Sequence, residues 1–578
     1  MSRSDPQTAM PPQRLLRMAD VAFRAGETAT AQSAMARLAG VLPSLKDGEM
    51  AKLLSLAIRG ERPALAADIM RHAATRPVMS PQLALAILRQ AQAVDSEQLA
   101  IAVETELIAR VEPSQRDVFR AKATRMRQGP GAALDVVRQV RRSGRTPASA
   151  VSLAQALLAA GKNVTARRYL RLCNRKWPNS PTIAELYLDA CCKSGRPDEA
   201  RAWLDTMDRG GREVFADALQ LRLALETGAL DRALKLLEQE VADGHRRASD
   251  PRLLRTRLAL GHLEDAEASA EAFRKDPTHS LKSSMHFGVH FIGQLLNELR
   301  FYRRIQNNGS RTGPGRTEAV TNFYAAKDIL DRWHETVGLP RPDRLPEQDV
   351  PKNIFQYWNA ETVPDEVQEV MRSWQSRAGW NYKLFSKRSA VAWLRRAMGP
   401  KFARAFSMAG KPAEESDFLR LCLLWSEGGI YADVDDRLVA KPEQLVELGP
   451  GLVVFREPFG ALDNNVICAP PKHPALSRAV VLARNALLRR DKDLIWLKTG
   501  PGLLTRAVAL SILDDSEDMQ GDLTIVPTSQ MGRIVQPHID LPYKHGQNDW
   551  RATPGVSSRE VASALLDLTA NDAQGARL

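Results

Sequence analysis

Apolar residues recur with helical spacing along the first half of the chain, and short breaks interrupt them at regular intervals. Successive breaks lie between 32 and 35 residues apart, at Gly26, Gly60, Val94, Gly129, Gly161, Gly195, Gly228 and Gly261. Five residues after each break stands a small or aliphatic residue, namely Ala31, Leu65, Leu99, Leu134, Ala166, Ala200, Ala233 and Ala266. A glycine permits a tight turn, and a small residue lets two helices approach closely. Since one helix pair cannot bury its apolar face alone, the pattern predicts an all-α solenoid of stacked pairs over residues 10–305.

A period near 34 residues, with four repeats that close on a proline, resembles the tetratricopeptide repeat family. The best match covers residues 151–178, and the aromatic residues of the family's first helix are mostly missing. The resemblance implies that the solenoid binds a protein partner or self-associates. Two alternatives stay open: a generic all-helical domain with chance spacing, and a nucleic-acid-binding array of the pentatricopeptide type, which has a similar period.

The hydrophobic pattern changes after residue 350. Residues 306–350 form a linker with one helix, and its end is rich in proline. Beyond it, short apolar strands at 353–358, 381–386 and 430–436 alternate with amphipathic helices at 364–377, 389–398 and 414–429. This alternation predicts an α/β domain over residues 351–555, with ligands beyond the carboxyl ends of the strands. We expect a C-terminal helix and tail over residues 556–578.

Composition and charge narrow the setting. The 578 residues carry a formal net charge of +13, which favours anionic partners such as nucleotide phosphates or an anionic membrane face, although an arginine-rich soluble protein is the plainer reading. The five cysteines show no CxxC spacing, so we expect neither a disulfide framework nor a zinc site. No run reaches the ~18 apolar residues that a membrane span needs, and the N-terminus has no apolar segment of a secretory signal. We therefore expect a cytoplasmic protein, with peripheral contact at the inner face of the cytoplasmic membrane compatible with the charge.

The segment 416–436 holds the candidate chemistry. Asp417 and Arg420 are three residues apart on a predicted helix and share a face. After a double glycine, Tyr431, Asp433 and Asp435 alternate along a predicted strand, so we expect them to point the same way and the residues between them to face the core. Two converging carboxylates are costly unless a cation lies between them, and oxygen ligands suit Mg²⁺ or Mn²⁺.

This group of residues resembles the sugar-binding, DXD-containing region of glycosyltransferase family 32. Four other segments match the same family in order, at 351–358, 464–476, 499–508 and 543–550. The resemblance covers roughly residues 350–551 and implies a GT-A fold, a divalent metal (Mn²⁺ or Mg²⁺) and a nucleotide-sugar donor such as a UDP- or GDP-sugar. It also implies that the configuration at the anomeric carbon is retained.

Carried over residue by residue, the resemblance implies a donor site. Asp417 and Arg420 would contact the donor sugar, with Tyr431 beside them. Asp433 would touch both the ribose and the metal, and Trp358 would stack on the nucleotide base. Packing in the core is the alternative for Trp358.

The resemblance also implies a metal site and further contacts. Asp435 and Asp433 would bind the metal, and with Arg420 they form the expected catalytic set. His545 would supply a third metal or diphosphate contact, while Asn465 and Trp550 are candidates for donor or acceptor contacts. A surface imidazole and a turn residue are the alternatives for His545 and Asn465. The family often has Gly-Ser before the closing tryptophan, where this chain has Asn-Asp, and this departure weakens the case for a hydroxyl contact to phosphate there.

The sequence thus predicts a metal-dependent, retaining glycosyltransferase that moves a sugar to a saccharide or lipid-linked acceptor. The expected setting is the synthesis of surface polysaccharide, lipopolysaccharide or capsule. The alternative is a protein-interaction scaffold whose transferase domain is inert. No nucleic acid is expected as a partner, because the chain offers no recognised nucleic-acid module.

Overall fold

The computed structural model describes residues 10–24, 28–94, 96–140, 146–207, 213–275, 291–307, 314–337, 350–514, 519, 521–545 and 559–570. Its internal packing divides the chain into two compact units. The first comprises Met1–Ala156, Phe273–Phe287 and Leu541–Leu578, and the second comprises Leu157–Ala272 and Gly288–Asp540. The second unit therefore combines helices of the repeat region with the sheet, whereas the sequence places a boundary at residues 306–350. The domain boundaries given above stay a prediction.

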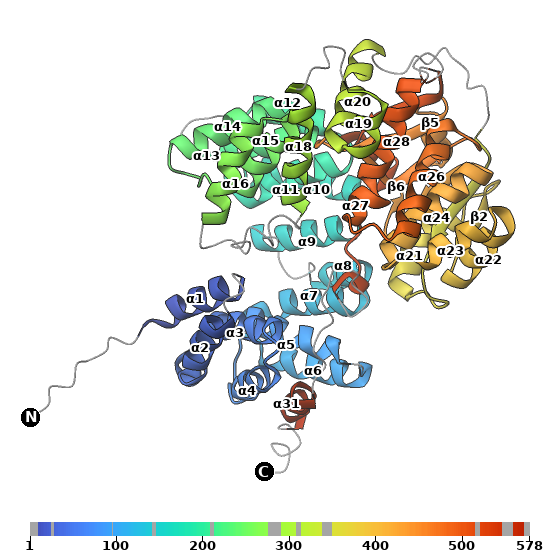
Figure 1. The fold of residues 1–578 in the computed structure, drawn as a ribbon. Helices are drawn as coiled ribbons and strands as arrows, with labels where there is room; N and C mark the ends of the chain where they lie inside the picture. Colours follow the sequence, from blue (N-terminus) through green and yellow to red (C-terminus); the bar gives the residue numbers. More distant parts are fainter. Residues whose placement is uncertain are drawn as a thin grey trace, which may run out of the picture. The chain divides into compact units, whose positions relative to one another are not determined.

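Most of the first unit consists of helices that pack in sequential pairs, drawn in shades of blue in Figure 1. Those helices are α1 (Pro12–Arg24), α2 (Thr28–Ala39), α3 (Asp47–Arg59), α4 (Pro63–Ala74), α5 (Pro81–Ala93), α6 (Glu97–Arg110), α7 (Arg116–Gln128) and α8 (Pro130–Val140). Helix α9 (Pro147–Ala159) runs from the first unit into the second. The expected C-terminal helix is α31 (Arg559–Ala570), and it packs on α4 and α6, so the end of the chain completes the core of this unit.

The helix pairs continue in the second unit with α10 (Asn163–Lys176), α11 (Pro181–Lys193), α12 (Pro197–Asp205), α13 (Glu213–Thr227), α14 (Leu230–Ala242), α15 (Pro251–Leu260), α16 (Leu263–Lys275) and α18 (Phe291–Asn307). The four break glycines of this unit lie between paired helices and all have positive φ values, of 65°, 68°, 74° and 74°, at Gly161, Gly195, Gly228 and Gly261. Each small residue that follows is fully buried, namely Ala166, Ala200, Ala233 and Ala266. The predicted helix pairs, with a glycine at the turn and a buried small residue five positions later, are confirmed in these repeats. Membership of the tetratricopeptide family stays a prediction.

The second unit also holds a six-stranded mixed sheet with the strand order β2-β1-β3-β6-β5-β7. Its strands are β1 (Asn353–Tyr357), β2 (Asn381–Phe385), β3 (Gly429–Ala432), β5 (Leu452–Arg456), β6 (Leu462–Ala469) and β7 (Leu523–Pro527). Strand β6 runs antiparallel to β3 and β5, and the other pairings are parallel. A two-stranded sheet pairs β4 (Arg437–Leu438) with β8 (Val535–Gln536).

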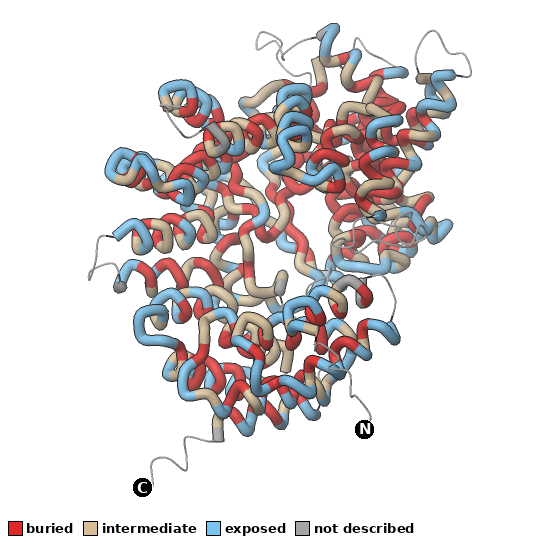
Figure 2. The backbone as a smooth tube through the Cα atoms, turned by 90° about the vertical axis from the view of Figure 1, so that its left-hand side faces the viewer, coloured by how far each residue is buried: buried red, intermediate tan, exposed pale blue. Residues whose placement is uncertain are grey.

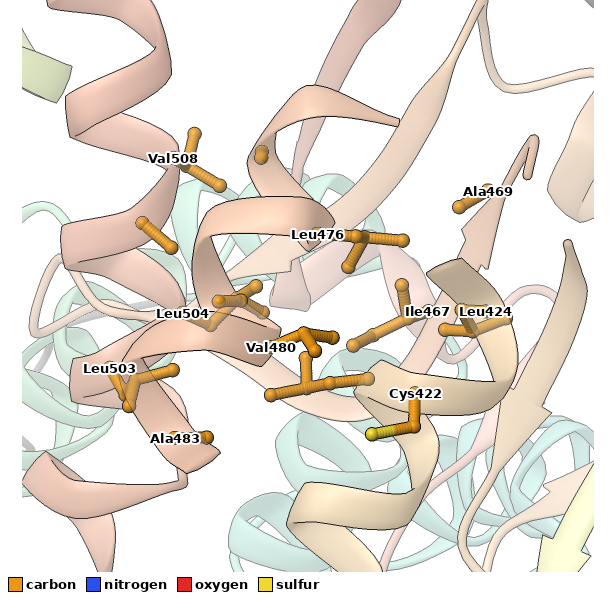
Figure 3. Packing of buried hydrophobic residues seen from close by; sticks show 14 of the residues in the cluster. Cys422, Leu424, Ile467, Ala469, Leu476, Val480, Ala483, Leu503, Leu504 and Val508 are labelled. Carbon is orange, nitrogen blue, oxygen red and sulfur yellow. The ribbon is translucent and has the colours of Figure 1, made fainter. Parts of the chain in front are cut away.

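Helices cover both faces of the main sheet, and buried residues line the surfaces where elements meet (Figures 1 and 2). These helices are α19 (Arg316–Thr321), α20 (Phe323–Val337), α21 (Asp365–Gln375), α22 (Lys387–Ala397), α23 (Pro400–Ser407), α24 (Pro412–Glu427), α25 (Glu443–Val446), α26 (Pro474–Arg489), α27 (Ile495–Lys498), α28 (Pro501–Asp514) and α30 (Thr528–Met531). Figure 3 shows one of the cores, where α24, α26 and α28 meet β6 around Leu424, Val480, Leu504 and Ile467. The predicted combination of an all-α region with an α/β region is confirmed.

Within the described part of the chain, every helix is too short or too polar to cross a lipid bilayer.

Candidate functional site

Polar side chains gather at one edge of the main sheet, where β1 and β3 end and β6 begins. Trp358 directly follows β1, Asp433 directly follows β3, and Asn464 and Asn465 lie in the first half of β6. Because β6 is antiparallel to β3, the start of β6 lies beside the end of β3. The backbone N–H of Asp433 donates to the carbonyl of Asn465 at 3.0 Å, which fixes this junction.

The double glycine before β3 allows that strand to pack tightly. Gly428 caps α24 with a φ of 65°, and Gly429 has a φ of 122°. A Cβ on Gly429 would lie 2.5 Å from the carbonyl oxygen of Asn353 in β1, so only glycine fits between the two strands. The strand then ends at Ala432, and Asp435 lies in a turn instead of on the expected strand face. The alternation predicted through residue 436 is therefore wrong after Ala432.

Arg420 joins two of the expected site carboxylates. Its side chain is 3% exposed, and its Nη2 lies 3.0 Å from Oδ1 of Asp433 and 3.2 Å from Oδ1 of Asp417. The guanidinium also lies 4.6 Å above the ring of Tyr431, which is fully buried and donates its hydroxyl to Asp433 at 3.3 Å. Burial alone would lower the pKa of Arg420, but Asp433 and its other anionic neighbours raise it above its usual value. Arg420 therefore stays charged and fixes both carboxylates.

Asp417 is buried, and each of its carboxylate oxygens accepts a hydrogen bond from a side chain distant in the sequence. Nδ2 of Asn464 donates to its Oδ1 at 2.9 Å, and the hydroxyl of Thr499, before α28, donates to its Oδ2 at 3.1 Å. Burial raises the pKa of Asp417, against the opposing effects of Arg420, Thr499 and Asn464. Thr499 and Asn464 lie in segments that matched the family in the sequence, but neither was named there as a site residue.

A second acidic group lies next to the first. Asp435, Asp436 and His538 each offer one ligand atom, and these atoms all lie within 4.8 Å of one another. Asp436 is fully buried; its Oδ2 accepts from Nδ2 of Asn465 at 2.7 Å, and its Oδ1 accepts from the backbone N–H of His538 at 2.9 Å. Burial, together with Asp435 and Asp433, raises the pKa of Asp436 well above its usual value. Adjacent buried carboxylates with an imidazole beside them fit a divalent cation, which would offset this charge.

The burial of Asp433 has a similar electrostatic effect. It raises the pKa of Asp433 to about 6, against the opposing effect of Arg420 and with a further contribution from Asp435. The Oδ1 atom of Asp433 is directed to Arg420 and Tyr431. The expected metal contact of Asp433 therefore stays a prediction.

Sequence reasoning missed two of the three clustered residues. Asp436 was in view as the last residue of the acidic run, but the expected strand alternation favoured Asp433 and Asp435. No pattern in the sequence marks His538 as a site residue. Its backbone has a φ of 57°, a conformation that no periodicity predicts. His545 ends a short 3₁₀ turn (Pro542–His545), but its side chain, like the whole of Trp550, lies outside the described residues.

Two further candidates have clear positions. Asn465 is 2% exposed and holds Asp436, so its role is inside the acidic cluster instead of in an exposed turn. Trp358 is partly exposed at the carboxyl end of β1, while the four residues before it are buried. Its indole N–H donates to the carbonyl of Thr362 at 2.9 Å, and its backbone N–H donates to the carbonyl of Phe385. The expected stacking on a nucleotide base stays a prediction.

Comparison with known proteins agrees with this geometry. Residues 364–448 match the family described as "Glycosyltransferase sugar-binding region containing DXD motif", a range that includes Asp417, Arg420, Tyr431, Asp433 and Asp435. The chain is 28% identical over 141 residues to mannosyl phosphorylinositol ceramide synthase SUR1 of Saccharomyces cerevisiae, which covers 24% of this chain and 36% of that protein. It is 29% identical over 130 residues to a protein named Toxin from Photorhabdus asymbiotica, which covers 22% of this chain and 4% of the toxin.

A solved structure named PaToxG Glycosyltransferase aligns with 41% of this chain and 97% of its own, at 17% identity and a TM-score of 0.25, which is too low to support an argument. The chain spans about a third of the length of the yeast relative and a small part of the toxin. The family match confirms the resemblance of the acidic segment to a DXD-containing glycosyltransferase region, while the assignment to family 32 stays a prediction. Residues 364–448 thus carry a glycosyltransferase sugar-binding region with a DXD motif.

Proposed function

We propose that this protein is a metal-dependent, retaining glycosyltransferase that moves a sugar from a nucleotide-sugar donor to a saccharide or lipid-linked acceptor. The observation that carries the proposal is the juxtaposition of two groups at one sheet edge. Asp435, Asp436 and His538 form a candidate cation site, and Arg420 fixes Asp417 and Asp433 beside it. The family match over the same residues supports a sugar donor.

Mn²⁺ or Mg²⁺ held by Asp435, Asp436 and His538 would supply a Lewis acid for the charge that develops on the departing diphosphate. The chain's own residues do the rest of the work. Asp417 and Arg420 are pre-positioned by their mutual contact and bind the donor sugar, while Asp433 binds the ribose and also approaches the metal. Trp358, at the open end of β1, stacks on a uracil or guanine base. The bond between the anomeric carbon and the diphosphate oxygen breaks through an oxocarbenium-like transition state, while the acceptor hydroxyl attacks from the same face and gives its proton to the departing diphosphate.

The acceptor class draws on the relatives. The name of the yeast protein describes the synthesis of a mannosylated phosphorylinositol ceramide, which is a glycolipid. A lipid-linked or polysaccharide acceptor at the cytoplasmic side of a membrane fits that chemistry and the net charge of +13. The helix pairs would bind a protein partner or a second copy of the chain. The role that we propose is in surface polysaccharide or glycoconjugate assembly.

The test is a screen of UDP- and GDP-sugars for Mn²⁺-dependent hydrolysis, with the full chain as the enzyme. We expect one donor to be hydrolysed, Asp435→Asn to abolish hydrolysis, and Asp198→Asn to leave it unchanged, because the side chain of Asp198 is 76% exposed on α12. Metal-dependent binding of a nucleoside diphosphate without hydrolysis of any donor would favour the inert scaffold. The absence of both binding and hydrolysis would refute the proposal.

A further inference from the structure

The turns of the helix-pair array contact the segment that carries His538. This segment comprises residues 530–539, includes β8, and belongs with helices α10 to α15 to the second unit. Nε of Arg533 donates to the carbonyl of Gly195 at 2.7 Å. A Cβ on Gly195 would lie 2.6 Å from Cγ of Arg533 and 2.8 Å from its backbone nitrogen. The turn between α11 and α12 therefore packs against the 530–539 segment with no room for a side chain.

A second turn of the array makes a similar contact closer to His538. A Cβ on Gly161 would collide with Cδ1 of Ile539 and would lie 3.2 Å from Oε1 of Gln536. Ile539 is 4% exposed and Gln536 is 1% exposed, so both are enclosed at this contact. The two turns are tied to each other, because Nδ2 of Asn163 donates to the carbonyl of Lys193 at 3.1 Å.

The same segment is bonded on its other side to the acidic cluster. The backbone N–H of Ile539 donates to the carbonyl of Asp435 at 2.9 Å, and that of His538 donates to the carboxylate of Asp436 at 2.9 Å. Strand β8 pairs with β4, which directly follows Asp436. His538 itself has a φ of 57°, a conformation that a residue other than glycine keeps only when its surroundings impose it.

From these contacts we infer that the Gly161 and Gly195 turns of the helix-pair array are positioning elements of the cation site, which hold His538 against Asp435 and Asp436. The array is then a structural part of the catalytic region, besides any role in binding a partner. The inference rests on the proposed function, because it assigns His538 to the metal. It predicts that a change at these two turns, away from every ligand, alters the affinity for metal.

The test measures Mn²⁺ affinity of the full chain by electron paramagnetic resonance of free Mn²⁺, without donor or acceptor. Gly195→Ala adds a side chain at the contact, and Arg533→Met removes the hydrogen bond to Gly195 without adding backbone strain. The matched control is Gly228→Ala, at another array turn with a φ of 74°, where the nearest atom to a Cβ is 3.6 Å away. We expect Gly195→Ala and Arg533→Met to weaken Mn²⁺ binding ~10-fold or more, as for groups that orient a metal ligand, and Gly228→Ala to leave it unchanged.

Double variants show whether the turn acts through His538. If it does, Gly195→Ala combined with His538→Ala binds Mn²⁺ no more weakly than His538→Ala alone. Additive losses of Mn²⁺ affinity in the double variant would overturn the inference. So would an unchanged Mn²⁺ affinity, equal to that of Gly228→Ala, in both Gly195→Ala and Arg533→Met. If Gly195→Ala fails to fold by circular dichroism, Arg533→Met decides. Failure of Asp435→Asn to weaken Mn²⁺ binding would instead refute the metal site of the proposed function. Loss with Asp435→Asn but not with His538→Ala would overturn this inference alone.

Discussion

Replacing Arg420 by methionine tests whether one buried cation holds the site together. Methionine fills similar volume but leaves Asp417 and Asp433 without the guanidinium that lies 3.2 Å and 3.0 Å from them. Removing one partner of a buried ion pair costs about 3–5 kcal/mol, because an uncompensated charge remains in the interior. The side chain of Asp417 is 9% exposed and that of Asp433 is 27% exposed, so most of the loss arises at Asp417. We expect Arg420→Met to lower the free energy of unfolding by about 4 kcal/mol at pH 7.5.

The pH dependence of this loss gives the test its direction. Burial already raises the pKa of Asp417 in the folded protein, and removal of Arg420 raises it further. A carboxyl group with a raised pKa in the folded state favours folding fully below its unfolded pKa, about 3.9, and loses that contribution as the pH rises through the folded value. The destabilisation caused by Arg420→Met should therefore be smaller at pH 5 than at pH 7.5.

The assay is urea unfolding followed by tryptophan fluorescence at both pH values. The control is Arg388→Met, because the side chain of Arg388 is 87% exposed on α22 and its loss should cost less than ~0.5 kcal/mol. A loss below ~1 kcal/mol for Arg420→Met at pH 7.5, or an equal loss at pH 5, would refute the reasoning.

Three further changes test the fold around the site by the same unfolding assay. Gly429→Ala would place a Cβ 2.5 Å from a carbonyl oxygen of β1 and should lower the free energy of unfolding by about 3 kcal/mol. The control Gly379→Ala, with a φ of 80° and open space around it, should lower it by about 1 kcal/mol. Equal losses would contradict the tight fit at Gly429. Burial raises the pKa of Glu457 to about 8. Glu457→Gln should therefore stabilise the protein above pH 8, where the buried carboxylate is charged, but not below pH 4.5. A gain in stability that is independent of pH would disprove the shift in pKa. Leu504→Ala should cost about 2–5 kcal/mol, because Leu504 on α28 is buried where α28 meets α26. The control Leu513→Ala should cost little, because Leu513 is 41% exposed on α28. Similar costs would show that Leu504 is not a core residue.

The parts of the fold that depend on local sequence were predictable. A glycine marks the turn of most helix pairs, and the positive φ of Gly195 shows that glycine suits that turn. The division into units was not predictable in this way. It depends on contacts between segments far apart in the chain, such as the one between Arg533 and Gly195, which no periodicity records.

In the site, too, local sequence predicts some contacts and tertiary packing determines the others. Asp417 and Arg420 could be paired from the sequence because three residues on a helix bring them to one face, and the structure joins them at 3.2 Å. The end of β3 could not be predicted, since the chain leaves the strand at Ala432 where an antiparallel neighbour, β6, supplies Asn465. His538 lies 102 residues after Asp436, and only tertiary packing brings the two together.

The charges of the site fall into two groups with different sources of compensation. Asp417 and Asp433 share Arg420, a cation that the chain itself provides. Asp435 and Asp436 adjoin each other, and burial with the neighbouring carboxylates raises the pKa of Asp436 well above its usual value. A cation bound beside these two carboxylates would offset their mutual repulsion. Arg420 therefore holds Asp417 and Asp433 by contacts within the chain, whereas the proposed cation would act on the other group, Asp435 and Asp436.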